Sequence, residues 1–328
     1  MKIVLFAFNT LFCVSVFAQP LPRKLLFTPS VYYREFSVKH QPVLYMEAGD
    51  TVMTESVDAG GVDKTGNRIT GRGNPLTGPF YIENAQPGDI IAVTIISVSL
   101  NRNYATTLNA LIPKMDEKRT GRKNWRSARL VKWMLDTLTL TGTADPRYDK
   151  LKNIRLKLHP FLGCIGVAPE GEKGMSSGAS GYFGGNIDSR FAREGTTVYL
   201  PVYHPGALLF LGDGHAAQGD GELNGDALET SMRFSFTTKL ITKGTTNMPV
   251  PLLEDSAYYM VPGIENSLER SMKVATMKIA DWLKKDFNLS TEEISQLIGP
   301  AIEYRIPKVA AGKVEVIAML PKSVLGRD

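Results

Sequence analysis

Residues that could bind a metal ion or transfer protons are concentrated in one stretch, 212–222, whose sequence is GDGHAAQGDGE. An apolar run, 207–211, precedes it, so a buried strand is expected to end in a polar loop. Asp213 and His215 alternate with Gly214, and in an extended strand both side chains project from the same face. A carboxylate and an imidazole on one face can share a divalent ion. The stretch therefore predicts a metal site at the end of a strand.

Three further polar side chains in this stretch, Gln218, Asp220 and Glu222, are again spaced by two. This spacing could present an amide and two carboxylates together, and a carboxylate near a metal ion can act as a general base. Two other interpretations exist. Asp-Gly pairs are common in ordinary turns, and a calcium loop beginning at Asp220 would end on Ser231, where a bidentate glutamate is needed.

The stretch 212–222 closely resembles the signature of the acetamidase/formamidase family, and further blocks that resemble this family surround it in the same order. These blocks are 49–52 with Asp58, 78–83 with 87–89, 159–169, 184–188, 194–202 and 320–322. The likeness covers most of the chain after the first forty or so residues. It implies hydrolysis of short linear amides to carboxylate and ammonia, and a mainly β fold with attached helices.

The resemblance also extends the candidate site beyond the central stretch. It places Asn186 and Asp188 in the active site, and the family keeps an acidic residue at the position of Asp58. The implied cofactor is a divalent metal, zinc or calcium. Neutral amide side chains can hydrogen-bond both halves of an amide substrate. The candidate metal ligands are Asp213, His215, Asp188 and Asp58. The candidate proton-transfer residues are Glu222 and Asp220, either of which could instead be a metal ligand. The candidate substrate-binding residues are Gln218 and Asn186.

Two residues, Ser176 and Cys164, are alternative candidates for a catalytic nucleophile, and a non-enzymatic function is an alternative to the amidase. Residues 174–178 match the pattern Gly-x-Ser-x-Gly, but charged residues precede Ser176 and glycines follow it, where a nucleophile elbow needs a strand and a helix. A flap beside the site is the better interpretation of this loop. Cys164 lies in an apolar run, which is typical of a packed side chain.

The alternative function is a non-enzymatic exported β-sandwich that binds calcium or a polyol through the same carboxylates.

The N-terminal segment 1–18 predicts a secretory signal peptide and therefore a periplasmic or secreted protein. It has one lysine near its front, an apolar middle and small-residue spacing before Gln19. Its removal leaves no stable membrane insertion and a net charge of about +4, from +5 for the whole chain. The remaining chain, 19–328, has Cys164 as its only cysteine, so it can form no intramolecular disulfide.

Short β-branched and aromatic runs separated by turn residues predict a mainly β (α+β) fold, with an antiparallel β-sandwich or barrel core and C-terminal helices packed on it. We expect one catalytic unit, with a β-rich part at about 25–160 and a site-bearing part at about 160–328. The predicted strands include 43–46, 51–54, 80–82, 90–100, 138–141, 154–158 and 314–320, and a hairpin that joins 196–202 to 207–211 through a turn with a solvated His204.

The C-terminal part predicts two helices. The segment 267–287 places Leu268, Met272, Ala275, Ile279 and Trp282 on one face. Residues 290–293 form a capping box that opens a helix ending at 299–300.

The segment 101–149 resembles the family least. Its basic part, 118–132, includes Trp125, and a solvated loop or edge hairpin explains it better than a nucleic-acid patch in an exported protein. The expected partner is a small-molecule amide, with no nucleic acid, and the resemblance allows a homo-oligomer.

Overall fold

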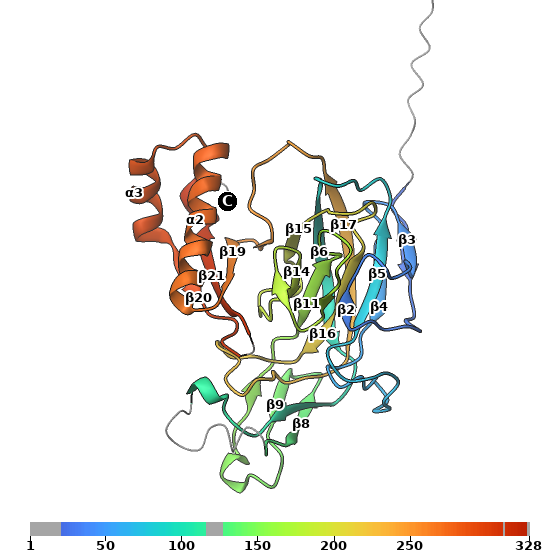
Figure 1. The fold of residues 1–328 in the computed structure, drawn as a ribbon. Helices are drawn as coiled ribbons and strands as arrows, with labels where there is room; N and C mark the ends of the chain where they lie inside the picture. The colour runs from blue at the N-terminus through green and yellow to red at the C-terminus, as the bar shows by residue number, and fades with distance from the viewer. Residues whose placement is uncertain (1–20, 116–126, 311, 327–328) are drawn as a thin grey trace, which may run out of the picture.

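The computed structural model describes residues 21–115, 127–310 and 312–326. The predicted signal peptide lies outside these ranges, as does residue Trp125 of the basic segment. Within them the chain forms two large open β-sheets that share one hydrophobic core, with smaller sheets and two α-helices attached (Figure 1). The predicted mainly β fold with C-terminal helices is therefore confirmed, and the sheets form a sandwich and no closed barrel in the described part of the chain.

The first large sheet has nine strands, and its neighbours are antiparallel except for the first pair. Runs rich in isoleucine and valine, such as IIAVTIISVSL in its central strand, suit a pleated and largely buried sheet. The order is β1 (Lys24–Leu26), β4 (Thr51–Glu55), β17 (Met232–Ile241), β6 (Ile90–Leu100), β15 (Thr197–Pro201), β18 (Leu252–Glu254), β19 (Tyr258–Glu265), β21 (Val314–Pro321) and β20 (Glu303–Arg305).

The second large sheet has six strands and carries the candidate site. Its order is β13 (Ser180–Gly181), β14 (Gly184–Asn186), β11 (Phe161–Val167), β16 (Leu209–His215), β5 (Leu76–Ile82) and β3 (Leu44–Met46). Every residue of β11 and β16 is buried, because one face packs in the shared core and the other is covered by loops and the site. The two parts predicted for the catalytic unit each contribute strands to both large sheets.

The predicted hairpin between 196–202 and 207–211 was wrong. β15 pairs with β6 and β18 in one sheet, whereas β16 pairs with β11 and β5 in the other. The connecting segment crosses from sheet to sheet, with Ala207 and Leu208 both at a φ of 57°. Apolar runs show that both strands are buried, but they do not show which strands pair. His204 is half-buried, with its Nε2 2.7 Å from the Pro169 carbonyl oxygen, so it is not the solvated residue expected.

A small four-stranded sheet projects from one end of the sandwich, at the bottom of Figure 1. Its order is β10 (Leu156–Lys157), β9 (Thr141–Thr143), β8 (Leu130–Asp136) and β7 (Tyr104–Leu108). β8 thus pairs antiparallel with both β7 and β9, whereas most of the loop or edge hairpin predicted at 118–132 lies outside the described residues. The strand expected at 138–141 begins only at Thr141, because Asp136 accepts hydrogen bonds from the backbone of Leu138 and Thr139 and holds a turn there.

Shorter elements complete the described part of the chain. A two-stranded sheet pairs β12 with β2, and three 3-10 helices lie in the connections. Their bounds are β2 (Glu35–Phe36), β12 (Met175–Ser176), η1 (Pro113–Met115), η2 (Asp149–Leu151) and η3 (Lys322–Leu325).

Both predicted helices are present and cover the end of the nine-stranded sheet. α2 (Leu268–Asp286) packs on β19 and β21, and α3 (Thr291–Ala301) begins with the predicted capping box and continues one residue past Pro300. Ala275, Ile279 and Trp282 of the predicted face are buried, but the first part of that face is not, because the backbone of Ser271 and Ala275 lies closest to Gly263 of β19. Leu268 and Met272 are therefore 44% and 46% exposed. The buried positions are Ser271, Ala275, Ile279, Trp282 and Leu283.

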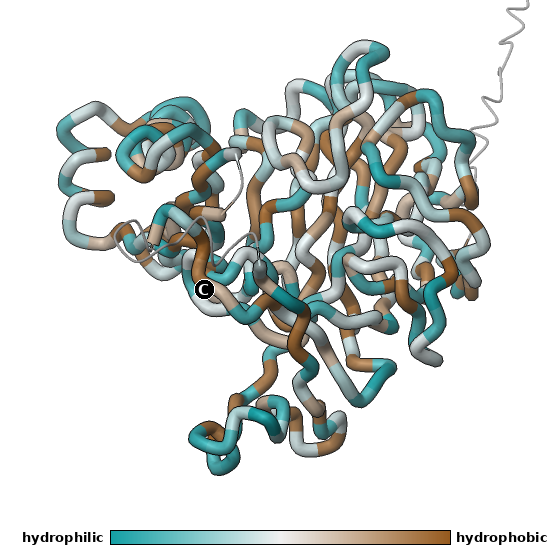
Figure 2. The backbone as a smooth tube through the Cα atoms, turned by 60° about the horizontal axis from the view of Figure 1, so that its bottom comes forward, coloured by the Kyte–Doolittle hydropathy of each residue, from teal (hydrophilic) through white to brown (hydrophobic). Residues whose placement is uncertain are grey.

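Hydropathy follows this architecture. Figure 2 shows hydrophobic residues along the strands of the sandwich, and hydrophilic residues along much of the outer loops. No helix among the described residues combines the length and the apolar character needed to cross a membrane.

Candidate functional site

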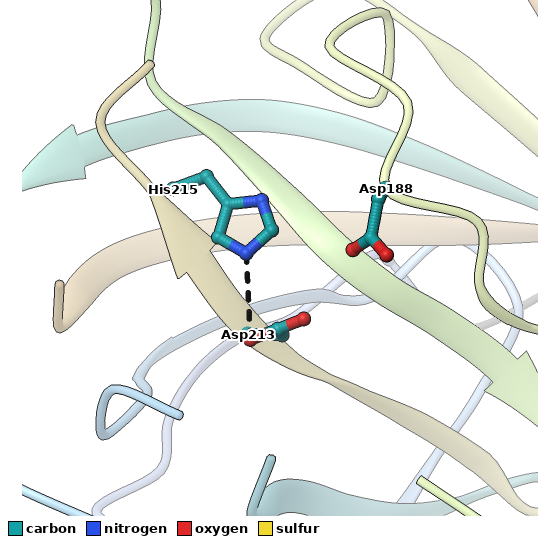
Figure 3. Close-up of side chains that lie close together, drawn as sticks. All are labelled: Asp188, Asp213 and His215. Atoms are coloured by element: carbon teal, nitrogen blue, oxygen red, sulfur yellow. Dashed lines mark ion pairs between the residues drawn. The ribbon is translucent and has the colours of Figure 1, made fainter. Parts of the chain in front are cut away.

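Three of the predicted metal ligands come together in the six-stranded sheet. Asp213 and His215 lie on β16, and Asp188 follows β14 on the other side of β11. One ligand atom from each lies within 4.8 Å of the others, and all three residues are buried. Figure 3 shows Asp188 and Asp213 converging from two backbone segments, with His215 Nε2 directed at Asp213. The distance from His215 Nε2 to Asp213 Oδ1 is 3.5 Å, as expected for side chains on one face of a strand.

A glycine leaves the space between these three side chains. Gly163 lies on β11 between Leu162 and Cys164, which pair with residues on either side of Asp213. A Cβ atom at Gly163 would lie 2.6 Å from Asp188 Oδ1, 2.8 Å from Asp213 Oδ2 and 2.8 Å from His215 Cε1. Any larger residue would therefore fill the space on which the three side chains converge.

The same side chains have buried polar atoms without hydrogen-bond partners. Asp188 Oδ1, Asp213 Oδ1 and His215 Nδ1 are in this state, while His215 Nε2 faces the carboxylates of Glu229 and Asp213. An unsatisfied buried polar atom costs about 1–3 kcal/mol, and native proteins have few. Two carboxylates and one imidazole around a small open space are a donor set that suits a divalent ion. The residues present thus fit the metal that the sequence predicts.

Backbone strain is also concentrated here. Asn74, Asp188, Asp213 and Glu222 all have positive φ, between 48° and 58°. This left-handed conformation is uncommon for residues other than glycine and costs of order 1 kcal/mol or more. The fold therefore holds these four polar residues in less favourable backbone geometry, as is common at functional sites.

Glu229 belongs to the site, although it was not among the site residues predicted from the sequence. Its backbone bridges Thr106 of the small sheet and His215 of β16, and its Oε1 lies 3.1 Å from His215 Nε2. Burial raises the pKa of Glu229 to about 8, against the opposing effect of His215. Burial lowers the pKa of His215, but the Glu229 and Asp213 carboxylates outweigh it and hold that pKa well above the usual range.

Lys308 is the second site residue that sequence reasoning missed. Its Nζ donates to Asp188 Oδ2 at 2.6 Å and to the Asn186 carbonyl at 2.5 Å, and lies 3.4 Å from Glu315 Oε1. Lys308 is 3% exposed, and a lysine among apolar neighbours in the segment 306–310 was the available signal. Burial opposes its charge, but Asp188 and Glu315 raise its pKa. Burial also raises the pKa of Asp188, despite Lys308. Lys308 thus binds one oxygen of Asp188 and leaves the other free.

Asn186 makes most of its hydrogen bonds to protein groups. Its Nδ2 donates to Asp188 Oδ2 at 2.5 Å, while its Oδ1 accepts from Cys164 Sγ at 2.6 Å and from Asn74 Nδ2 at 3.2 Å. Asn74 Nδ2 also donates to Asp213 Oδ2 at 3.1 Å. The structure therefore gives Asn186 a position from which it orients the ligand carboxylates, with one N–H of its amide still available to a ligand. Cys164 is fully buried, and burial together with Asp213 raises its thiol pKa well above the usual range, so it is a poor nucleophile.

Asp58 does not join the cluster. Its Oδ2 accepts from Arg102 Nη2 at 2.8 Å and its Oδ1 accepts from the backbone of Val62 at 2.9 Å. Arg102 in turn donates to the backbone carbonyls of Tyr104 and Asp63. The expected fourth ligand is thus the acidic half of a buried ion pair, which the arginine neutralises.

The remaining candidates line a cavity of about 600 Å³ beside the cluster. Gln218 Nε2 donates to the carbonyls of Asp188 and Pro307, which leaves its Oε1 as a buried atom without a partner. Glu222 is buried, and burial followed by the charge of Asp188 raises its pKa well above the usual range. Asp220 is exposed and pairs with Arg190 at 3.3 Å, so the structure places it at the rim.

Ser176 lacks the context of a nucleophile elbow. It is exposed at the end of β12, pairs with Glu35 of β2, and accepts a hydrogen bond from the backbone of Gly178. No helix follows it among the described residues. The loop 170–185 does lie beside the site, where the Ser177 carbonyl accepts from Cys164 Sγ at 3.3 Å.

Comparison with known proteins supports the resemblance seen in the sequence. The Acetamidase/Formamidase family matches residues 36–180 and 171–324. The formamidase of Methylophilus methylotrophus is 23% identical over 292 residues, which cover 69% of this chain and 70% of that protein. A Schizosaccharomyces pombe protein whose name assigns it to the formamidases is 38% identical over 66 residues, which are 20% of this chain and only 16% of that protein.

Solved structures agree. An acetamidase from Bacillus halodurans superposes with a TM-score of 0.80 and 25% identity, covering 92% of this chain and 99% of that one. An acetamidase from Yersinia enterocolitica gives a TM-score of 0.79 and 25% identity, over 94% and 95% of the two chains. The family match spans nearly the whole described chain and includes the site residues of β11, β14 and β16. The chain therefore belongs to the acetamidase/formamidase family of amide hydrolases.

Proposed function

We propose that this chain is an exported, metal-dependent amidase that cleaves the C–N bond of short linear amides, to give a carboxylate and ammonia. Family membership supports amide hydrolysis in general. The observation that carries the metal dependence is the convergence of Asp188, Asp213 and His215 over Gly163, with buried ligand atoms left free. Export is supported by the signal-like segment 1–18. The names of relatives, formamidase and acetamidase, support small amides as substrates.

Asp188, Asp213 and His215 would hold the ion. Imidazole is a common zinc ligand, whereas calcium prefers six or more oxygen ligands, so this donor set favours zinc or a similar ion. Three protein ligands that leave a position open are typical of catalytic zinc sites. When bound, the ion supplies a Lewis acid that polarises the amide carbonyl.

The protein groups around the ion have separate tasks. Glu222 would take a proton from the attacking water and return it to the leaving nitrogen, so that ammonia departs and the acyl group keeps the water oxygen. Its raised pKa makes the carboxylate a stronger base toward the proton of the water. Gln218 Oε1 is free to accept from the substrate NH₂.

Two further groups would position the ligands. Glu229 lies against His215 Nε2 and fixes the orientation of the ring. Lys308 holds Asp188 Oδ2 and offsets part of the negative charge that two ligand carboxylates bring into a buried site.

The test is ammonia release from formamide, acetamide and propionamide by the mature protein as purified, after chelation, and after return of zinc or calcium. We expect turnover that disappears with chelator, returns with one metal, and survives Ser176→Ala. Turnover that ignores chelation and disappears in Ser176→Ala would replace the metal mechanism by a serine mechanism. A folded, metal-loaded protein that cleaves no amide would favour a non-enzymatic binding module.

A further inference from the structure

The cavity beside the metal cluster is large for the amides named by the relatives. Its volume is about 600 Å³. A water molecule occupies roughly 30 Å³ in the liquid, so an amide of the size of acetamide needs on the order of 100 Å³. Most of the cavity would remain unused by such a substrate. Ligand-binding cavities of several hundred Å³ usually accommodate molecules much larger than acetamide.

One end of this cavity faces the proposed catalytic groups. Glu222 and Gln218 line it, and so does Asp226. Gln218 connects this end of the cavity to the metal cluster, because its Nε2 donates to the backbone carbonyl of Asp188 at 2.9 Å. An amide bound at the cluster can therefore extend its remaining part into the cavity.

Apolar side chains form another part of the cavity wall. Trp133 and Leu156 come from the small sheet, and Leu223 and Leu228 come from the loop after β16. Trp133 is half-buried, and Leu156 and Leu223 are 38% and 43% exposed, so these side chains have free hydrocarbon surface.

Several polar lining groups are already engaged with the protein. Asn224 Nδ2 donates to Thr107 Oγ1 at 2.6 Å and to the Leu108 carbonyl at 2.9 Å. Gln218 Nε2 is bound by two backbone carbonyls. Arg190 pairs with Asp220, so these charges at the rim offset each other. What is left for a ligand is a wall that is largely apolar, with Lys157 and His159 as its free polar members, and that leads to a polar catalytic end.

From this arrangement we propose that the cavity is a subsite for the acyl group, and that the preferred substrates are primary amides with an aromatic or branched hydrocarbon on the acyl carbon. This proposal rests on the proposed amidase function. The hydrocarbon is on the acyl side because the nitrogen leaves as ammonia and carries no substituent. Burying a hydrocarbon group against an apolar wall strengthens transition-state binding, and a single methylene contributes about tenfold or more.

The first experiment compares kcat/KM of the metal-loaded enzyme for acetamide and for 2-phenylacetamide. We expect the value for 2-phenylacetamide to exceed that for acetamide by at least about tenfold. If the enzyme cleaves acetamide with the higher kcat/KM, the subsite proposal is wrong, while the amidase function stands.

Two variants of the wall test where this preference arises. Trp133→Ala and Leu223→Asp should each lower the ratio of the two kcat/KM values by about tenfold. Leu223 is on the surface, so its replacement leaves the fold intact even if Trp133→Ala does not. Leu138→Ala is the matched control, because Leu138 is 94% exposed on the same small-sheet region but outside this cavity. An unchanged ratio in Leu223→Asp would overturn the proposal.

A binding measurement separates this inference from the proposed function. Calorimetric titration of the Glu222→Gln protein with 2-phenylacetamide and with acetamide needs no turnover. If the wild type cleaves no amide but Glu222→Gln binds 2-phenylacetamide more tightly, and Leu223→Asp in the same background weakens that binding, the amidase function fails and the apolar subsite stands. If neither amide binds, the subsite fails as well.

Discussion

Asp58 and Asp213 are two buried aspartates that the sequence alone treats alike, since both are acidic residues in glycine-rich blocks and both are candidate metal ligands. Asp58 lies 2.8 Å from a buried arginine and has hydrogen bonds to both oxygens. Asp213 lies against a histidine and another carboxylate, and its Oδ1 has no hydrogen bond. The comparison shows that residue type does not separate a structural carboxylate from a ligand. The hydrogen-bond partners of the carboxylate oxygens separate the two kinds of residue.

The two regions also differ in charge balance. The Asp58–Arg102 pair is electrically neutral and needs nothing from outside the chain. Around Asp213 the described residues place four buried carboxylates, beside the Lys308 ammonium and the His215 imidazole. Those carboxylates are Asp188, Asp213, Glu229 and Glu222. Burial and neighbouring carboxylates raise the pKa of Asp188, Glu222 and Glu229, and a bound cation would favour their charged forms, whereas Asp58 already has its countercharge in Arg102.

The largest expected effect is that of Asp213→Asn on catalysis. Because a Lewis-acid ion stabilises the transition state by several kcal/mol, and each 1.4 kcal/mol or so is tenfold in rate, we expect kcat/KM to fall by at least about 10³-fold. The measurement is ammonia release under saturating metal. Asp58→Asn is the matched control and should keep activity per folded molecule. Equal losses in the two variants would erase the distinction between the two regions.

The second prediction concerns the contribution of the Asp58–Arg102 ion pair to stability. Asp58→Asn leaves Arg102 buried without a countercharge, which should lower the free energy of unfolding by about 3 kcal/mol. Urea denaturation measures it, and Asp58→Asn combined with Arg102→Met should recover part of the loss because no charge is then left unpaired. No change in unfolding free energy would mean that the ion pair contributes nothing to the fold.

Gly163→Ala tests the space between the ligands and should have a smaller effect on metal binding. Its Cβ would lie within 2.8 Å of all three ligand side chains, so they must move apart, and we expect metal affinity to fall by about 10- to 100-fold. Calorimetric metal titration provides the measurement. Gly219→Ala serves as control, because a Cβ there meets nothing within 4 Å. Unaltered affinity in Gly163→Ala would place the ion elsewhere.

The smallest effect is a shift in pH dependence. Burial, and then the charge of Asp188, raise the pKa of Glu222, so its basic form is lost already at a pH above the usual glutamate range. As pH falls through that pKa, kcat/KM should decrease by about tenfold per pH unit, and it should be constant at higher pH. Glu222→Gln should remove this limb together with most of the activity. An acidic limb near the usual value of about 4.5 would show that Glu222 is not the base.

Local pattern was enough to predict part of the site. An apolar run followed by alternating Asp213 and His215 places both side chains on one face of β16, because a strand has a period of two. The capping box of α3 is equally local. The family resemblance contributed Asp188.

Other features depend on contacts between distant segments. Glu229 reaches His215 through bridges between two sheets, and Lys308 arrives from a segment more than a hundred residues after Asp188. The crossing between β15 and β16 is likewise a matter of strand pairing, which an apolar run does not specify. The predicted face of α2 differs from the structure only at Leu268 and Met272, near the point where the helix backbone packs closely on Gly263.

The most direct test of the metal site is elemental analysis of the mature protein after incubation with zinc or calcium and removal of excess ion. The wild type and Asp58→Asn should each retain about one ion per chain, and Asp213→Asn should retain none. A folded wild-type protein that retains no ion, or an Asp213→Asn protein that retains as much as the wild type, would contradict the assignment of Asp188, Asp213 and His215 as a metal centre.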